Sequence, residues 1–250
     1  MKGPRILLEV CVEDAAGILA ADNGADRIEL CAALALGGLT PSAGLMDLAV
    51  ASPLPTMAMI RPRAGDFVWS AAERRAMRAE IRAARAAGLA GVVIGASLPD
   101  GRLDDETLAE LLAEAAGLDV TLHRAIDLCP DPAEAMETCA RLGIRRVLSS
   151  GGAATAAAGV ARLKAMARPG ITVMPGAGID AGNLRDLARL ALREVHASCS
   201  SPRSAPGLAA VETFGFQPKG ARATDPARVA ALRAALDQIS ASQPEGWTAS

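Results

Sequence analysis

The chain has 250 residues, of which 51% are hydrophobic and 22% are charged, and its formal net charge is −2 at pH 7. This length allows one large domain or two small ones with a sizeable core. A charge near zero gives no electrostatic reason to expect a nucleic-acid partner, and no apolar stretch approaches the ~20 residues that span a bilayer. We therefore expect neither nucleic acid nor a membrane as a partner.

The five cysteines predict reduced thiols and not a disulfide framework. Their number is odd, and the first residues become acidic at Glu9 without the apolar segment of an export signal. Disulfides are rare in the reducing environment of the cytoplasm. We therefore expect a cytoplasmic protein whose cysteines are free.

Short apolar runs rich in Ile, Val and Leu recur at regular intervals along the chain. There are eight of them, at residues 5–12, 27–32, 56–62, 91–96, 120–127, 145–150, 171–176 and 194–198. Their length and composition predict strands that are buried on both faces, as in a parallel sheet.

Helix start signals lie between these runs. Ser70 and Glu73 have the spacing of a capping box, and Asp131 precedes a proline at the first position of a helix. Asp180 can cap a helix over residues 181–192. Strands therefore alternate with helices along the chain.

Eight strands that alternate with helices in a chain of this length predict an α/β fold, a (β/α)8 TIM barrel that forms a single domain over residues 1–250. A doubly wound sheet is the alternative, but it normally has fewer strands, and none of these runs has the pattern of an edge strand. Residues 199–223, rich in Pro, Gly, Ser and Arg, are predicted to form a long loop after the eighth strand. A C-terminal helix is predicted over 224–241.

Polar residues collect at the ends of the predicted strands, where barrels carry their reactive groups. Side chains two residues apart on a strand share a face, so the pairs Glu-x-Cys and Glu-x-His can point into the barrel together. By the same argument His123, Ala125 and Asp127 are expected to share a face of the fifth strand. Carboxylates and imidazoles can transfer protons, and an arginine can hold an anion. The candidate catalytic residues, expected to meet at the barrel mouth, are Glu9, Glu29, Arg61, His123, Asp127 and His196.

Glycine-rich turns follow the sixth and seventh predicted strands. They can be simple tight turns, or they can present backbone N–H groups to an anion, because barrels often bind phosphate near strands seven and eight. The candidate anion-binding residues are Ser150, Gly151, Gly176 and Gly178.

Several segments resemble a known family. They are LEVCVED, GADRIELCAALALGGLTPS, MIRPRAGDF, VTLHRAID, RVLSSG, VMPGAGI and EVHAS, in this order between residue 6 and about residue 200. The chain resembles the CutC family of copper homeostasis proteins. The resemblance implies a cytoplasmic TIM barrel, a homo-oligomer of two or more chains, and a Cu(I) ion held by Cys11 and Cys31. Soft thiolates select Cu(I), and neighbouring strands lie only ~4.8 Å apart.

Three functions agree with these patterns. The first is a Cu(I)-binding homeostasis protein. The second is a barrel enzyme that acts on a small phosphorylated or sugar-like molecule, with His123 and His196 as acid/base residues and Arg61 as an anion clamp. The third is a non-catalytic assembly module, with exposed apolar helix faces and a dry, filled barrel mouth. Independently of these functions, a cysteine such as Cys11 or Cys31 can be a small buried hydrophobic residue.

Overall fold

The computed structural model describes residues 5–187, 189–203 and 208–242. Within these ranges one sheet contains eight strands in the order β7-β6-β5-β4-β3-β2-β1-β8. All of the pairings in this sheet are parallel. The strands are β1 (Leu7–Val12), β2 (Arg27–Leu30), β3 (Thr56–Met59), β4 (Gly91–Ile94), β5 (Asp119–Leu122), β6 (Arg146–Ser149), β7 (Thr172–Pro175) and β8 (Glu194–Ala197).

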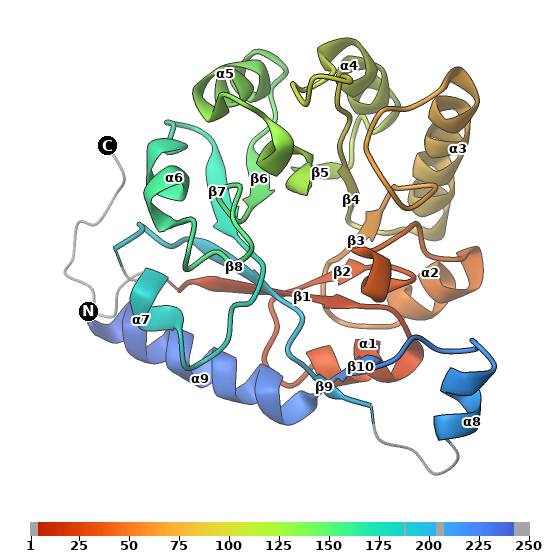
Figure 1. Cartoon of the computed structure of the whole chain (residues 1–250), viewed down its shortest axis with the longest axis vertical. Helices are drawn as coiled ribbons and strands as arrows, with labels where there is room; N and C mark the ends of the chain where they lie inside the picture. The colour runs from red at the N-terminus through yellow and green to blue at the C-terminus, as the bar shows by residue number, and fades with distance from the viewer. Residues whose placement is uncertain (1–4, 188, 204–207, 243–250) are drawn as a thin grey trace.

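The sheet curls into a nearly closed barrel (Figure 1). The first and last strands of the barrel pair with each other, because Leu7 is in register with Glu194 and Glu9 is in register with His196. β7, at the other edge of the sheet, also lies against β8. Each of the eight predicted apolar runs overlaps one of these strands, and only β5 begins outside its run, one residue earlier, so the predicted TIM barrel is confirmed.

Helices lie around the outside of the strands (Figure 1). No helix in the described part of the chain is long and apolar enough to cross a membrane. Two 3-10 helices, η1 (Leu34–Leu36) and η2 (Arg124–Leu128), follow β2 and β5. The α-helices are α1 (Ala15–Ala21), α2 (Ala43–Val50), α3 (Ala71–Ala87), α4 (Asp105–Glu114), α5 (Pro132–Arg141), α6 (Val160–Ala165), α7 (Leu184–Leu187), α8 (Leu208–Thr213) and α9 (Pro226–Ser242).

Two of the predicted helix starts are formed as expected. The Ser70 hydroxyl accepts from the Glu73 N–H at 3.3 Å, and Glu73 Oε2 accepts from the Ser70 N–H at 2.7 Å, which is the complete capping box of α3. Asp131 caps α5, because its side chain accepts the N–H groups of Ala133 and Glu134. The segment 181–192 differs from its prediction, because among its described residues only α7 is helical. Asp180 holds a turn ahead of α7, and the chain then turns back into β8.

The fifth predicted strand is shorter than expected. β5 ends at Leu122, and the chain then winds into η2. His123 Nδ1 accepts the N–H of Ala125 at 3.1 Å and so caps η2. His123 and Asp127 therefore do not share a strand face, and the period-two argument for that pair was wrong.

The segment 199–223 is more ordered than the predicted loop. It contains β9 (Ser200–Pro202), α8 and β10 (Arg222–Thr224), and the two short strands pair antiparallel. The long C-terminal helix α9 follows, beginning two residues later than predicted. Asp225 connects the turn between β8 and β9 with α9. Its N–H donates to Cys199 O, and its carboxylate caps α9 by accepting the Ala227 N–H.

Alternate residues of each strand face different surroundings. On β1, Leu8, Val10 and Val12 are buried in the apolar core between the sheet and the helices. Glu9 and Cys11 alternate with them and point into the barrel, as the period of two requires. The barrel interior also holds a small apolar cluster of Cys31, Met57, Met59 and Val93, packed by Leu34. The interior is thus partly apolar and partly charged.

Candidate functional site

A series of ion pairs runs through the inside of the barrel. Arg27 Nε lies 2.5 Å from Glu9 Oε2, and Arg27 Nη2 lies 2.5 Å from Glu194 Oε2. Arg146 Nε lies 2.9 Å from the same oxygen of Glu194, and Arg146 Nη1 lies 2.7 Å from Asp119 Oδ2. Each ion pair thus joins opposite charges, which offsets the cost of burying Glu9, Arg27 and Glu194. Asp119, at the start of β5, is exposed.

This network keeps Glu9 ionised although its side chain is completely buried. Burial alone would raise the pKa of Glu9, but the hydrogen bond from His196 and the charge of Arg27 outweigh it and lower the pKa to about 2. Burial likewise opposes the charge of Arg27, yet Glu9 and Glu194 raise the pKa of that guanidinium. Glu9 is therefore a permanent anion at neutral pH.

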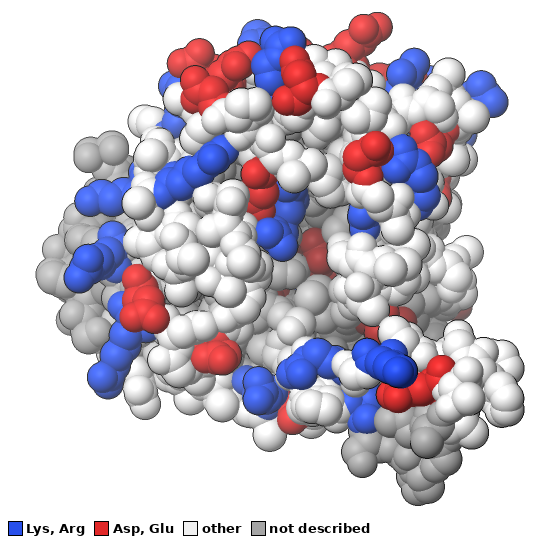
Figure 2. Space-filling view, in the orientation of Figure 1, with Lys and Arg blue, Asp and Glu red and all other residues white. Residues whose placement is uncertain are grey.

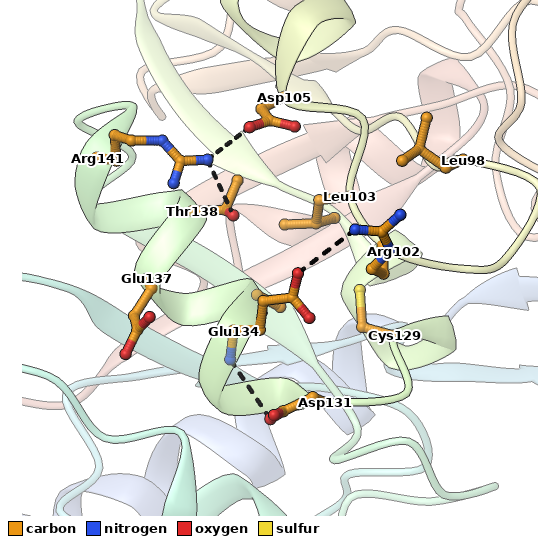
Figure 3. Close-up of a pocket in the computed structure, with 11 residues that line it drawn as sticks. Leu98, Arg102, Leu103, Asp105, Cys129, Asp131, Glu134, Glu137, Thr138 and Arg141 are labelled. Carbon is orange, nitrogen blue, oxygen red and sulfur yellow. Dashed lines mark hydrogen bonds and ion pairs between the residues drawn. The ribbon is translucent and has the colours of Figure 1, made fainter.

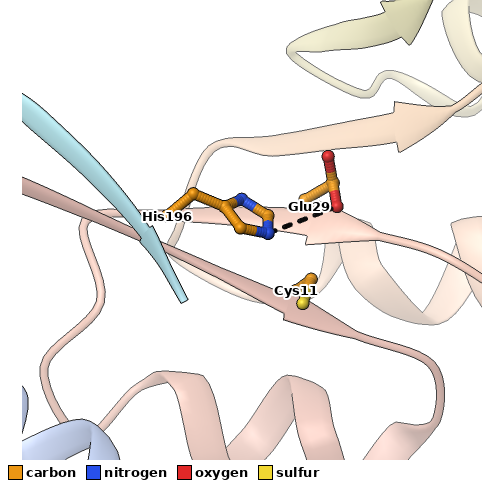
Figure 4. Close-up of side chains that lie close together, drawn as sticks. All are labelled: Cys11, Glu29 and His196. Carbon is orange, nitrogen blue, oxygen red and sulfur yellow. Dashed lines mark ion pairs between the residues drawn. The ribbon is translucent and has the colours of Figure 1, made fainter. Parts of the chain in front are cut away.

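Three potential metal ligands meet beside this network (Figure 4). Cys11, Glu29 and His196 each offer one donor atom, and these atoms all lie within 4.8 Å of one another. The three residues come from β1, β2 and β8, which are neighbours in the sheet. All three side chains are buried, and Glu29 Oε1 has no hydrogen-bond partner. A buried oxygen without a partner marks a place where a bound group would be stabilised.

His196 is held in a fixed orientation by carboxylates on both sides. Its Nδ1 lies 2.8 Å from Glu9 Oε1, and its Nε2 lies 3.8 Å from Glu29 Oε2. Burial opposes protonation, but the surrounding Glu29, Cys11 and Glu9 raise the pKa of His196 well above its usual value. The Glu9–His196 bond leaves Nε2 as the ring nitrogen that faces Glu29 and Cys11.

Cys31 contacts the same oxygen of Glu29 that faces His196. Its Sγ is 3.5 Å from Glu29 Oε2, and its side chain is completely buried. Burial, together with the nearby Glu29 carboxyl, raises the pKa of the Cys31 thiol well above its usual value. Burial also raises the pKa of Glu29 itself. Cys11 and Cys31, the cysteines of the two Glu-x-Cys pairs, thus both lie close to the Glu29 carboxyl. The raised pKa keeps the Cys31 thiol protonated.

The sequence profile of the CutC family matches residues 6–201. The chain belongs to the CutC family. A CutC family protein of Sinorhizobium medicae (strain WSM419) is 55% identical over 244 residues, which cover 95% of this chain and 98% of the relative. A CutC family protein of Rhizobium meliloti (strain 1021) is 54% identical over 238 residues, which cover 93% of this chain and 97% of that relative.

Solved structures agree with this assignment. The crystal structure of CutC from Streptococcus agalactiae, which is named for copper homeostasis, matches with a TM-score of 0.72 and 28% identity. The match covers 77% of this chain and 98% of that chain. N-(5'-phosphoribosyl)anthranilate isomerase from Pyrococcus furiosus matches with a TM-score of 0.57 and 14% identity over 93% and 99% of the two chains. This second likeness concerns the barrel fold alone.

In this CutC protein, Arg61 and His123 form a separate group around Phe67. The Arg61 guanidinium lies 5.2 Å from the centre of the Phe67 ring, and the His123 and Phe67 rings are 4.6 Å apart. Arg61 Nη1 donates to the carbonyl of Leu36, at the end of η1, and Arg61 Nη2 donates to the carbonyl of Gly65. Burial and the charge of Arg61 lower the pKa of His123 to about 3. His123 is therefore neutral at neutral pH.

Asp127 is fully engaged with the turn after β6. Its Oδ1 accepts from the Ser149 hydroxyl at 2.6 Å and the Gly152 N–H at 3.0 Å, and both of its oxygens lie 3.1 Å from the Ser150 N–H. These bonds outweigh burial and lower the pKa of Asp127. An external anion at this turn would have to compete with the Asp127 carboxylate.

The other predicted anion-binding N–H groups are also engaged or lie apart. The Gly151 N–H donates to Ser149 Oγ at 2.9 Å, and the Gly176 N–H donates to Ser149 O at 2.9 Å. Gly178 lies farther along, at the edge of a larger cavity described below. Anion binding by these residues therefore stays a prediction, and the N–H groups of Gly151 and Gly176 are already bonded within the protein.

A small cavity of about 150 Å³ lies away from the barrel interior, among residues of α4, α5 and the turns that precede them (Figure 3). Its wall carries pairs of opposite charge, such as Arg141 with Asp105 at 2.5 Å and Arg102 with Glu134 at 3.8 Å. Figure 2 shows that such charges of both signs are scattered over this face of the molecule. Because its charges are already paired, this cavity offers no recognisable ligand chemistry.

Three members of the ion-pair network, Arg27, Arg146 and Asp119, are not among the residues predicted from the sequence, whereas Glu194 belongs to the predicted Glu-x-His pair. Arg27 precedes Glu29 by two residues, so the period of two along a strand also places Arg27 on the face of Glu29.

Proposed function

We propose that this CutC protein binds Cu(I) as its cargo at Cys11 and His196, with Glu29 and Cys31 beside the ion, and serves in copper homeostasis. The observation that carries the proposal is the meeting of Cys11, Glu29 and His196, whose donor atoms lie within 4.8 Å of one another. Thiolate and imidazole are ligands that suit Cu(I), whereas a carboxylate contributes less to a soft ion.

The surroundings of His196 support this proposal. Metal-binding histidines generally donate their second ring N–H to a carboxylate, which fixes the ring and strengthens the ligand nitrogen. Glu9 Oε1, 2.8 Å from His196 Nδ1, occupies that position, and Arg27 and β1 hold Glu9 in place. Binding would require His196 to release the proton that its neighbours stabilise, so copper affinity should fall at low pH.

The state of the cysteines agrees with a reducing environment. All five are free thiols in the structure, and Cys11 and Cys31 are both buried. Thiols stay reduced in the cytoplasm. We infer that the protein acts there.

Cu(I) competition against a chelator under reducing conditions tests the proposal. Cys11→Ser and His196→Gln should each weaken Cu(I) binding by at least about tenfold, since each removes a ligand. Glu29→Gln should have a much smaller effect. Cys139→Ser and His123→Gln are the matched controls, because Cys139 is buried on α5 and His123 caps η2. Equal affinity in all five variants and the wild type would eliminate the copper site.

A second candidate function, a barrel enzyme for a small anionic molecule, is favoured by a different observation. His123 Nε2, Arg61 Nε and Ser97 Oγ are buried without a hydrogen-bond partner. All three residues adjoin Phe67, because the Ser97 N–H donates to Phe67 O at 2.9 Å. A ligand that enters past Phe67 would satisfy these groups. Retention of activity or ligand binding in His123→Gln and Arg61→Gln would exclude this role for them.

A further inference from the structure

A second, larger cavity lies beside the barrel, at the carboxyl ends of β7 and β8. Its volume is about 600 Å³. One wall is the loop after β7, from Gly178 to Gly182, and another is the loop after β8, from Ser198 to Ser200. β10 and the first turns of α9 complete it with Arg222, Arg228, Ala231 and Leu232.

Two arginines of this wall have no acidic partner in the described part of the chain. Arg222 Nε donates to Ser200 Oγ at 2.9 Å, and Arg222 Nη2 donates to Ser200 O at 2.5 Å, which holds the guanidinium against the β8 loop. Arg228 makes no ion pair with a described carboxylate, although its charge acts on the nearby Cys199. Basic side chains gather over β9 and β10 on this side of the molecule (Figure 2).

The acidic residue in the cavity wall is turned toward its own loop. Asp180 Oδ1 accepts the N–H groups of Gly182 at 2.8 Å and Asn183 at 3.2 Å. Asp180 is therefore already hydrogen-bonded and does not pair with Arg222 or Arg228. The cavity presents two cationic groups and an apolar wall that includes Ile179 and Leu232.

The backbone of both loops is held in an unusual conformation. Only three non-glycine residues in the described part of the chain have a positive φ, and two of them are Ala177 (φ 79°) and Cys199 (φ 44°). Ala177 precedes the cavity wall, and Cys199 forms part of it. Cys199 O also accepts from the Asp225 N–H at 2.9 Å, which ties the β8 loop to the start of α9. Strain of this kind is retained at sites that need a fixed geometry.

We propose that this cavity binds the phosphate group of a small phosphate monoester, with Arg222 and Arg228 as its cationic ligands. TIM barrels frequently build phosphate sites from the loops after strands seven and eight, and guanidinium groups bind phosphate oxygens in pairs. The apolar wall and the volume leave room for the organic part of the ester. This site differs from the copper site and does not depend on it. A small phosphate monoester would then be the substrate of the barrel enzyme that is the second candidate function above.

Isothermal titration calorimetry with ribose 5-phosphate as the probe tests this proposal. We expect saturable binding of ribose 5-phosphate, weaker binding of inorganic phosphate, and no binding of ribose. Arg228→Gln should weaken binding by about tenfold, the loss expected for one charge-assisted contact. Arg222→Gln should do the same, with circular dichroism and melting temperature to show that β9 and β10 remain folded. Arg75→Gln, an exposed arginine of α3 outside this cavity, is the matched control.

The possible results separate this proposal from the others. Cys11→Ser and His196→Gln should bind ribose 5-phosphate as the wild type does, even if both lose copper. The proposal is overturned if ribose 5-phosphate does not bind at millimolar concentration, or if Arg228→Gln and the folded Arg222→Gln bind it unchanged. It is also overturned if Arg75→Gln loses as much affinity as they do, or if inorganic phosphate binds as tightly as the ester.

Discussion

Glu9 and His196 join the first and the last strand of the barrel through a 2.8 Å hydrogen bond between Oε1 and Nδ1. The same glutamate accepts from Arg27 through its other oxygen, at 2.5 Å. One buried carboxylate thus connects the potential metal ligand His196 with the interior network of ion pairs. Its removal should affect both stability and the site.

Glu9→Gln should lower the free energy of unfolding by about 3 kcal/mol at pH 7, because it leaves Arg27 with less negative charge around it. The pKa of Glu9 is about 2 in the folded protein and 4.5 in an ordinary setting. Its contribution is therefore complete above pH ~4.5 and is lost as the pH falls toward ~2. Urea denaturation between pH 7 and pH 3 measures this. If the free energies of unfolding of variant and wild type differed by the same amount at every pH in that range, the lowered pKa of Glu9 would be contradicted.

His123 should remain neutral while the protein is folded, because its pKa is lowered from 6.5 to about 3. The unfolded chain takes up this proton below pH ~6.5, so the wild type should lose about 1.4 kcal/mol of stability per pH unit between pH ~6 and ~4 from this group. His123→Gln should reduce that slope.

Nuclear magnetic resonance of the two imidazoles provides a direct check. The His123 ring signals should stay constant from pH 8 to pH 4, whereas those of His196, whose pKa is raised, should show the protonated form at neutral pH. A His123 titration near pH 6.5 would show that its ring is solvated.

Gly95→Ala should destabilise the protein by about 3 kcal/mol. A Cβ at this position would lie 2.1 Å from His123 Cε1, so the imidazole could not keep its place. Gly44→Ala is the control, because nothing lies within 4 Å of its Cβ position and alanine favours the helix α2. Thermal unfolding should rank wild type between the two variants. Equal melting temperatures for both variants would show that the His123 ring does not lie against Gly95.

Ala177→Gly should stabilise the protein by up to about 1 kcal/mol, because Ala177 has a φ of 79° that glycine adopts without strain. Ala79→Gly, at an exposed position inside α3, should instead cost about 1 kcal/mol. Chemical denaturation compares the two. A loss of stability in Ala177→Gly similar to that in Ala79→Gly would show that the Ala177 backbone is not strained.

The sequence was informative where local patterns decide the structure. Apolar runs located every strand of the barrel, and the spacing of Glu9 from Cys11 placed both side chains inside it. Sequence spacing could not show that Glu9 meets His196, because that contact depends on the register in which β1 and β8 close the barrel. Two residues of the expected set, Arg61 and His123, instead gather around Phe67.

The turn after β6 shows a second limit of sequence reasoning. A run of glycines following a strand is equally compatible with an anion site and with a turn that an internal carboxylate fills. Asp127 supplies that carboxylate, and it can do so only because the chain leaves β5 early and winds into η2. The apolar residues around His123 gave no sign of that change, since 3-10 turns lack a strong sequence pattern.

The closure of the barrel by β1 and β8 has a consequence for the order of folding during synthesis. Glu9 can meet Arg27, 18 residues away, once the second strand has left the ribosome, but its other partner, His196, lies 187 residues from Glu9. Until then the open edge of β1 stays unpaired, and such edges are prone to wrong association. A ribosome-bound chain that stops before residue 194 should therefore be bound by chaperones and cut by proteases, whereas one that extends beyond α9 should resist both.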